Sequence, residues 1–544
     1  MAEKHLEIER KYDAAADFEL PDLSGLSGVA ALSAPEAHRL HATYFDTGDL
    51  RLAAHGITLR RRRGGADAGW HLKTPVGPDS KQELRAPLGR ARIVPSQLAS
   101  VVAAYTRGAA LAPVATLETG RTVIRLLDEA GETLAEIADD TVTGRDLRGT
   151  VRPGPEPGPA PPADPLGTPP RAPAEMWREI EVELVAGPPA LLKAAGKRLA
   201  KAGAGRAGSS SKLGRLLGGS IEPSAAARAR AVARARVQEA VPSAGDAVNA
   251  YLAAQVEAVL KHDPGARLAE DDAVHRMRVA VRRIRSALQT YRPVLDRGVT
   301  DPLRPELKWL AGVLGEVRDL EVLRMRLTRR LEALRKADGP DGPDGPDGPG
   351  EPDGPGGAGA AAPLAWMEDI ARQERSAYRR LNSALKEPRY FALLDAVESL
   401  VTDPPLTKRS GRTAAKELPG LVTRSWTRLE KAYSTIEDAE DAATARHETR
   451  KAAKRARYAA ELAAPVLGKP AEETVKNAKR IQEVLGGYQD GVIAMERLSA
   501  SVGRARGAAE AFTLGVLYGL EHGEAESARD RLASTWAQVS APSF

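Results

Sequence analysis

Three charged residues near the start of the chain, Glu7, Glu9 and Lys11, occupy alternating positions. Because the side chains of a β-strand alternate between its two faces, all three would point to the same side if this segment is a strand. Two carboxylates beside an ammonium group could bind a hard divalent cation and a phosphate oxygen together. Leu6 and Ile8, which alternate with Glu7 and Glu9, would then lie on an apolar opposite face.

The same alternation returns along the first 217 residues. The charged residues that would share a strand face are Arg60 and Arg62, His71 and Lys73, Glu83 and Arg85, Arg121 and Arg125, Glu136 and Asp140, and Glu179, Glu181 and Glu183. In an open sheet these charges would face the solvent. In a closed barrel they would line the interior, where acids and bases together favour a polyphosphate ligand with Mg²⁺ or Mn²⁺. Alternation alone permits both arrangements.

The composition limits the chemistry that is possible. Cysteine is absent from all 544 residues, which excludes disulfides, thiolate metal sites and a cysteine nucleophile. The formal net charge is only +6, from 79 basic and 73 acidic residues, so local charge is more informative than the total. The sequence has neither a signal peptide nor an apolar run of about 20 residues that could span a bilayer. We expect a soluble cytoplasmic protein that has no membrane partner.

The elements that would position these charges differ between the two parts of the chain, which predicts an α+β multidomain protein. Short strand-like stretches separated by Gly, Pro and Asp predict a β-rich domain over residues 1–217. A Pro-rich stretch at about 149–173 is predicted to be a disordered insertion in it. A linker is predicted at 218–225.

Residues 226–544 are predicted to form a helical domain, because apolar residues recur at spacings of three and four. DGP triplets over 338–361 indicate a flexible acidic linker, which leaves halves of about 226–337 and 362–544. The core stripe of the first half would be Val274, Met277, Val281, Ile284 and Leu288.

The two helical halves repeat one another. HRMRVAVRRIR from His275 matches HETRKAAKRAR from His447, and LKWLAGVLGEVRD from Leu307 matches AKRIQEVLGGYQD from Ala478. Similarity that keeps its order indicates an internal duplication, and two units favour a pseudo-symmetric bundle with a two-fold repeat over a solenoid.

A basic stripe accompanies the apolar stripe in both halves. Its residues are His275, Arg278, Arg282, Arg283 and Arg285 in the first half and His447, Arg450, Lys454, Arg455 and Arg457 in the second, with Lys308 and Lys479 on the next repeated helix. Like charges at this spacing reduce helix stability, so their retention in both halves favours an extended polyanionic ligand over a solvated face. The two histidines are predicted to be phosphate donors rather than metal ligands.

Residues 1–217 resemble the CYTH superfamily, the triphosphate tunnel metalloenzymes. The resemblance rests on EIERK at Glu7, which resembles the ExExK signature, followed in order by TYFDT, TLRRR, LKTP, EIADD, EIEVEL and SSSKL. It implies an eight-stranded antiparallel β-barrel tunnel that binds triphosphate-containing substrates with a divalent metal, Mg²⁺ or Mn²⁺.

Carried onto this sequence, the resemblance assigns roles to individual residues. It implies phosphoryl ligands at Lys11, Arg60, Arg62, Lys73, Arg85, Arg125 and Lys212, and metal ligands at Glu7, Glu9, Asp140, Glu181 and Glu183. Spacing does not separate Glu179 from the last two, so it is kept as a candidate ligand. Lys11, with Glu7 and Glu9, is the candidate catalytic group, because a lysine whose pKa is lowered could position or deprotonate the attacking water.

The helical part, about residues 226–535, resembles the CHAD family of conserved-histidine α-helical domains. The matching segments are VHRMRVAVRRIRSAL from Val274, its duplicate from His447, and the pair LGEVRD and LGGYQD. The resemblance implies binding of inorganic polyphosphate along a basic cleft, and association with polyphosphate granules.

We therefore expect a metal-dependent hydrolase of inorganic triphosphate or polyphosphate ends, with a helical domain that recruits the polymer. A class IV-type adenylate cyclase and a non-catalytic polyphosphate-binding protein remain alternatives. Nucleic acid is a poorer ligand, because aromatic residues make up only 4% of the chain and base stacking needs them. The sequence does not predict the oligomeric state.

Overall fold

The structure is a computed structural model, and it describes residues 3–77, 79–148, 174–337 and 364–544. The predicted insertion at 149–173 and the predicted DGP linker at 338–361 lie outside the described residues. The chain divides into two compact units, Met1–Ser224 and Ala225–Phe544.

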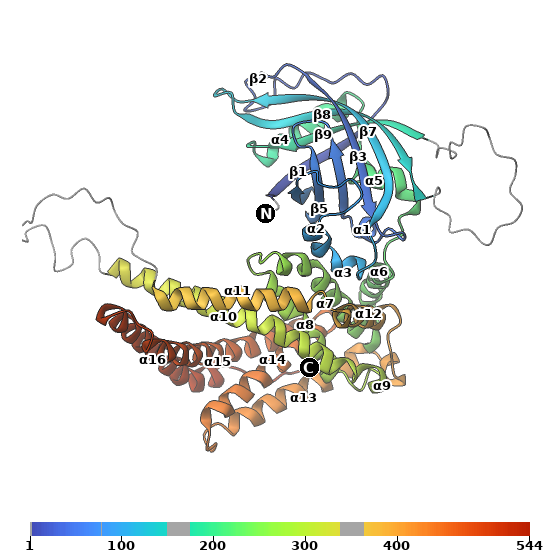
Figure 1. The fold of residues 1–544 in the computed structure, drawn as a ribbon. Coiled ribbons are helices and arrows are strands. Elements are labelled where there is room, and N and C mark those ends of the chain that lie inside the picture. The colour runs from blue at the N-terminus through green and yellow to red at the C-terminus, as the bar shows by residue number, and fades with distance from the viewer. Residues whose placement is uncertain (1–2, 78, 149–173, 338–363) are drawn as a thin grey trace, which may run out of the picture. The chain divides into compact units, whose positions relative to one another are not determined.

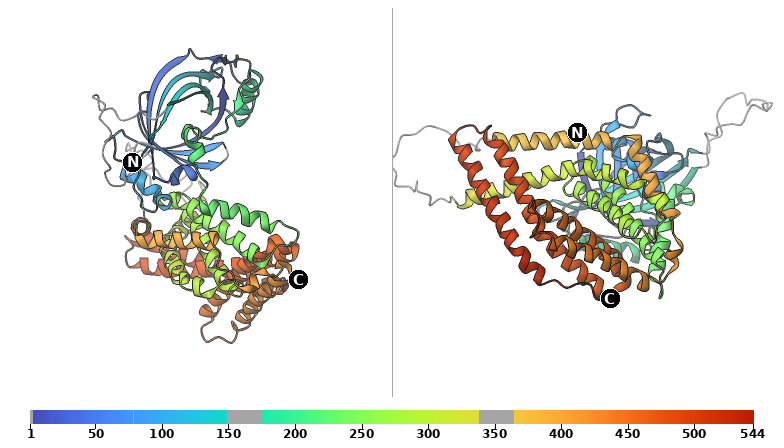
Figure 2. Two further views of the ribbon diagram at one scale, coloured as in Figure 1. Left: turned by 90° about the vertical axis from the view of Figure 1, so that its right-hand side faces the viewer. Right: turned by 90° about the horizontal axis from the view of Figure 1, so that it is seen from below.

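The first unit is an eight-stranded antiparallel barrel, as predicted (Figure 1). Its strands follow the spatial order β1 (Glu3–Ala14), β6 (Ser80–Ala86), β5 (Gly69–Gly77), β4 (Thr58–Arg63), β3 (Glu36–Asp46), β7 (Ala112–Leu127), β8 (Thr133–Asp146) and β9 (Ala174–Leu184). The barrel closes because β9 pairs again with β1. Two short strands pair at its margin, β2 (Ala31–Leu32) with β7 and β10 (Gly205–Arg206) with β1. The left view of Figure 2 shows the curvature of this sheet.

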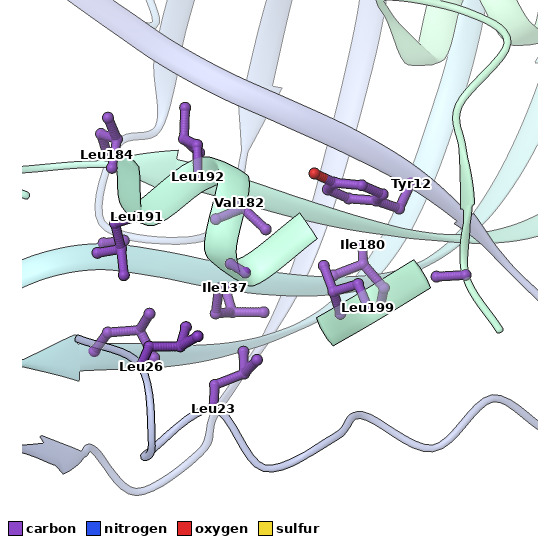
Figure 3. Close-up of a cluster of buried hydrophobic side chains, with 14 of the residues drawn as sticks. Tyr12, Leu23, Leu26, Ile137, Ile180, Val182, Leu184, Leu191, Leu192 and Leu199 are labelled. Atoms are coloured by element: carbon purple, nitrogen blue, oxygen red, sulfur yellow. The ribbon is translucent and has the colours of Figure 1, made fainter. Parts of the chain in front are cut away.

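Apolar residues cover the outside of the barrel, which leaves the charged residues for the inside. Ile180 and Val182 of β9 are fully buried beneath helix α4 (Pro189–Lys201), together with Ile137 of β8 and Tyr12 of β1 (Figure 3). The alternate residues of β9 therefore face the interior. This burial answers the question that alternation left open, and the charges point inward.

A second apolar cluster covers the outer face of β4, β5 and β6. Leu59, Trp70, Leu72 and Leu84 pack against α2 (Ser96–Val101), and α3 (Ala103–Thr106) follows it. The remaining helices of this unit are α1 (Arg51–Ala54) and α5 (Lys212–Leu217), after which a 3-10 turn spans Gly218–Ser220.

The second unit is helical. Its helices are α6 (Ala225–Val237), α7 (Ala244–Arg267), α8 (Ala273–Thr290), α9 (Arg297–Thr300), α10 (Leu303–Ala337), α11 (Ala365–Ala384), α12 (Pro388–Thr402), α13 (Ala414–Ser434), α14 (Ala442–Leu467), α15 (Lys469–Val502) and α16 (Ala508–Ala537). None of the helices in the described ranges is both long and apolar enough to cross a membrane.

The packing of this unit repeats itself. Helix α8 packs on α7 and α10, and its duplicate α14 packs on α13 and α15; α11 and α16 then pack on α10 and α15 (right view of Figure 2). The duplicated helices α8 and α14 also contact each other. The predicted core stripe of α8 is confirmed, since all five of its residues are fully buried. Its duplicate places Ala453 and Ala456 in the core, where Trp426 and Ile481 pack against them.

Candidate functional site

The register of the barrel strands places the inward charges in rows. Glu9 of β1 pairs with Glu183 of β9, and Glu183 pairs in turn with Glu136 of β8. Two residues further along β1, Lys11 pairs with Glu181. Three carboxylates therefore lie side by side on adjacent strands, and the next row begins with an ammonium group.

These rows line an internal cavity of about 260 Å³. Its charged lining consists of the basic residues Lys11, Arg60, Arg62, Lys73, Lys81, Arg85, Arg121 and Lys212, and of the acidic residues Glu7, Glu9, Asp67, Glu136, Glu181 and Glu183. All the predicted phosphoryl ligands except Arg125 line this cavity. Four of the six candidate metal ligands line it too.

Arg125 lies apart from the other predicted ligands. It is absent from the lining of the cavity, and its side chain is 33% exposed. Its guanidinium donates to Glu36 Oε1 at 2.7 Å and to Glu136 Oε1 at 3.0 Å. The arginine of β7 that lines the cavity is Arg121, four residues before Arg125 on the same strand face.

Lys212 lies among a deeply buried set of carboxylates. Its ammonium group is 2.8 Å from both Asp140 Oδ2 and Glu179 Oε1, and 2.7 Å from Glu181 Oε1. The helix α5 begins at Lys212, and the Ser211 hydroxyl caps it by accepting from the Gly214 amide. Arg121 also donates to Asp140 at 2.7 Å and to Glu181 at 2.6 Å.

Asp140, Glu179 and Glu181 are grouped closely enough to hold a metal ion, with one oxygen of each within 4.8 Å of the others. In this structure, however, Lys212 and Arg121 already neutralise the group. The nearby positive charges of Lys212 and Arg121 outweigh burial and lower the pKa of Asp140. A metal ion here would have to displace the Lys212 ammonium.

A second carboxylate group, Glu7, Glu9, Glu136 and Glu183, has an excess of negative charge. Burial and repulsion from Glu7, Glu9 and Glu136 together raise the pKa of Glu183 to about 7, against the opposing charge of Lys73. No ion pair is recorded for Glu183 within the described part of the chain, whereas Glu7 contacts Lys73 at 2.5 Å and Glu9 contacts Lys81 at 2.9 Å. A cation placed beside Glu183 would relieve the repulsion.

Lys11, the candidate base, is buried among charged residues of the cavity. The pKa of its ammonium group is lowered to about 7, chiefly by burial and also by the charges of Lys212 and Lys81, against the opposing effect of Glu9 and Glu179. The group contacts Glu181 and lies 3.2 Å from Glu9 Oε2. A lysine with such a pKa can exchange a proton near neutral pH.

Seven residues that line the cavity were not among the predicted ligands: Tyr44, Thr58, Asp67, Lys81, Arg121, Glu136 and Ser211. Lys81 lies opposite Glu7 in the β1–β6 ladder and contacts Glu9, and the Tyr44 hydroxyl accepts from Arg60 at 3.4 Å. Asp67, in the loop between β4 and β5, pairs with Arg62. Cross-strand pairing could have revealed Lys81, but a loop residue such as Asp67 has no periodic signal.

In the helical unit, the two basic stripes carry matching contacts. Arg278 lies 3.5 Å from Asp319, and Arg450 lies 3.5 Å from Asp490. Both aspartates end the repeated segments LGEVRD and LGGYQD. The Nε atoms of both arginines are buried, and they have no hydrogen-bond partner among the described residues.

The predicted histidines lie beside these arginines but differ from each other. Burial lowers the pKa of His275, and the charge of Arg318 lowers it further. His447 instead contacts Gln489 Oε1 through Nδ1 at 3.2 Å. Lys479, the other predicted residue on α15, is exposed and lies 3.5 Å from Glu483.

A basic cavity of about 420 Å³ opens between α8, α10 and α14. Its basic lining residues are Arg282, Arg285, Arg304, Lys308, Lys451, Lys454 and Arg455, which include five of the predicted ligands. Burial, together with the charges of Arg450, Arg282 and Arg278, lowers the pKa of Lys454 to about 7. This crowding of positive charge is typical of a surface that binds an anion.

Comparisons with known proteins match both units. The family model of the CYTH domain matches residues 5–216, and that of the CHAD domain matches residues 250–499. Two Mycobacterium tuberculosis proteins, MT2285 of strain CDC 1551 and Rv2226 of strain H37Rv, are each 35% identical over 543 residues, 97% of this chain and 95% of their own length.

Two solved structures are also similar to this chain. PptA from Streptomyces chartreusis is 23% identical with a TM-score of 0.42, and the match covers 54% of this chain and 100% of that one. The CHAD domain from the plant Ricinus communis is 23% identical with a TM-score of 0.43, over 56% of this chain and 95% of that one.

Proposed function

The chain belongs to the family of proteins that join a CYTH domain to a CHAD domain. We propose that its barrel is a divalent-metal-dependent triphosphatase. Its substrate would be inorganic triphosphate or the end of a polyphosphate chain. The observation that carries the proposal is the cavity itself, in which eight basic side chains and six carboxylates line one enclosed space.

The basic residues of the cavity would hold the phosphate oxygens. Arg60, Arg62, Lys73, Arg85 and Lys212 provide donors around the space, and Arg121 and Lys81 add two that the sequence analysis did not assign. So many cations in one cavity repel each other until an anion arrives. Burial lowers the pKa of Arg62 to about 9, and repulsion from Arg60 and Arg121 contributes to this value.

The carboxylates fit a divalent cation. Mg²⁺ and Mn²⁺ prefer oxygen ligands, and Glu7, Glu9 and Glu183 present them beside the phosphate donors, with Glu136 as a further neighbour. When bound, such an ion neutralises phosphate charge and lowers the pKa of a water bound to it. Asp140, Glu179 and Glu181, which the sequence also offered as ligands, would instead keep Lys212 and Arg121 in place.

Lys11 would act as the base. Its neutral form, which a pKa near 7 makes available, can accept a proton from the water that attacks the terminal phosphorus. Glu181 and Glu9 hold its nitrogen toward the cavity.

We assign the helical unit the binding of the longer phosphate polymer. The basic cavity between α8, α10 and α14 supports this role, since it presents seven basic side chains and one carboxylate, Asp301. The polymer would be bound mainly by charge, so raising the salt concentration should weaken it. Competition of long-chain polyphosphate against DNA of equal charge would identify the preferred polyanion, and we expect polyphosphate to win.

The experiment that tests the proposal compares products. Full-length protein is incubated with inorganic triphosphate or with ATP, under Mg²⁺ and under Mn²⁺, and orthophosphate and cyclic AMP are measured. We expect orthophosphate from triphosphate as the main product. Among the described residues, Tyr44 is the only aromatic side chain that lines the cavity. This scarcity of aromatic residues disfavours an adenine site. Cyclic AMP as the main product would overturn the proposal in favour of a cyclase.

A further inference from the structure

The internal duplication of the helical unit provides four arginines at two repeated positions. When the chain is aligned on His275 and His447, Arg283 corresponds to Arg455, and Arg285 corresponds to Arg457. Two-fold pseudo-symmetry would then create two equivalent anion pockets. One would combine Arg285 of α8 with Arg455 of α14, and the other would combine Arg457 of α14 with Arg283 of α8.

The first of these pockets is open. Arg285 and Arg455 both line the 420 Å³ basic cavity, and no ion pair is recorded for either within the described residues. The Oγ atom of Ser286 and the Nε atom of Arg282, two further residues of this lining, are buried and have no hydrogen-bond partner in the part of the chain described. Unsatisfied donors around a cavity indicate a missing acceptor.

The second pocket is closed by a carboxylate. Glu461 accepts from Arg283 Nε at 2.9 Å and from Arg457 Nε at 2.8 Å, and the Glu461 side chain is only 14% exposed. Both guanidinium groups also lie against the ring of Tyr458, at 5.7 and 5.8 Å from its centroid. Both arginines on this side therefore already share a charged partner, Glu461.

One difference between the repeats accounts for the ion pairs on only one side. The residue that corresponds to Glu461 in the first half is Gln289, which lines the open cavity. The two side chains have nearly the same shape, but only Glu461 carries a charge that can neutralise two arginines and repel an incoming phosphate.

We propose that Glu461 makes the helical unit one-sided: phosphate chains bind in the Arg285 and Arg455 pocket, and Glu461 occupies the pseudo-symmetric pocket in place of a phosphate group. This inference rests on the proposed binding of phosphate polymers. It also removes Arg283 and Arg457 from the set of phosphate ligands that the sequence predicted.

The test exchanges the two residues between the halves. Glu461→Gln, Gln289→Glu and the double variant are prepared in the full-length chain and titrated with inorganic tetraphosphate in EDTA by calorimetry. Any binding in the barrel is a constant background, because neither residue belongs to that unit. Relative to the wild type, we expect Glu461→Gln to gain one site per chain and Gln289→Glu to lose one, or to bind there at least about tenfold more weakly. The double variant should recover the wild-type number of sites.

Each outcome decides the inference. Equal numbers of sites and equal affinities in the wild type and both single variants would overturn it while leaving polymer binding intact. No binding above the barrel background in the wild type would overturn the role proposed for the helical unit as well. If Glu461→Gln loses its circular dichroism signal on heating well before the wild type, Gln289→Glu alone still gives the answer, since it adds a charge at a cavity wall and leaves no arginine unpaired.

Discussion

At the scale of single residues, two groups in the barrel have pKa values close to neutrality, and they arrive there from opposite directions. Burial lowers the pKa of Lys11 from 10.5 to about 7 and raises that of Glu183 from 4.5 to about 7. Both side chains line the same cavity. In the proposed mechanism, Lys11 as the base and Glu183 as a metal ligand would gain their reactive forms over the same pH interval.

The first prediction concerns Lys11. Because only the neutral amine can accept a proton, kcat for triphosphate should rise with pH through about 7. Lys11→Arg keeps the positive charge but cannot lose a proton in this range, so its kcat should fall by roughly 100-fold with little change in KM. Steady-state kinetics between pH 6 and pH 9 provide the measurement. If kcat/KM falls by the same factor but kcat is unchanged and only KM rises, Lys11 only binds substrate.

The second prediction concerns Glu183 in the metal-free protein. Its folded pKa is higher than its unfolded value of 4.5, so it stabilises the fold at low pH, and that contribution is lost as the pH rises through about 7. The free energy of unfolding should fall by at most roughly 3 kcal/mol across this interval. Glu183→Gln should remove most of the fall, as measured by denaturant unfolding at pH 5 and pH 8 in EDTA. The affinity for Mn²⁺ should increase with pH in the wild type, because Glu183 ionises. It should not increase in Glu183→Gln.

Strand alternation and the resemblance to the CYTH superfamily together located most of the cavity residues in the sequence. Alternation shows which residues share a strand face, but it does not show which part of that face lines the cavity. Arg121 and Arg125 share one face of β7, but the sequence does not say how far along the strand the cavity extends. In TLRRRR, Arg60 and Arg62 point inward, while Arg61 donates to the Leu88 carbonyl outside the cavity.

At the scale of elements, the inward direction of the charges depends on what covers the outside of the barrel. Helix α4 buries Leu191, Leu192 and Leu199 against Ile180 and Val182 of β9 (Figure 3). Without this cover, the apolar face of β9 would be exposed, and the sheet would lose the free energy that holds its carboxylates inside.

The third prediction tests this contact. Gly196 of α4 lies so close to the Tyr12 hydroxyl that a Cβ atom there would overlap it. Gly196→Ala should lower the free energy of unfolding by about 1–3 kcal/mol, although alanine favours a helix more than glycine does. Lys197→Ala, next to it on the exposed side of α4, is the matched control and should change stability by less than about 0.5 kcal/mol. A stabilised Gly196→Ala variant would contradict this account of the packing.

Helical elements were predictable to the extent that they are amphipathic. The apolar stripe of α8 gave its core face correctly, and the duplication identified α14 as its counterpart. The contact between α8 and α14, and the neutralisation of Arg283 by Glu461 across it, could not be predicted, because packing between two helices is a tertiary property.

At the scale of the whole molecule, both units present enclosed or partly enclosed positive charge, and they differ in how it is balanced. The barrel offsets its basic residues with six carboxylates in the same cavity, which suits a metal-bridged triphosphate. The basic cavity of the helical unit contains one carboxylate, Asp301, which suits a polymer bound by charge alone. Composition could not show this difference, since the total charge of +6 averages over both.

The measurement that tests the central claim most directly is orthophosphate release from inorganic triphosphate by the full-length chain, with Mg²⁺, with Mn²⁺ and in EDTA. We predict release that requires a metal and falls by at least roughly 100-fold when Glu7→Gln and Glu9→Gln are combined. Lys308→Ala, in the basic cavity of the helical unit, is the control and should retain wild-type release. Release that persists in EDTA, or that survives the loss of both carboxylates, would contradict the claim.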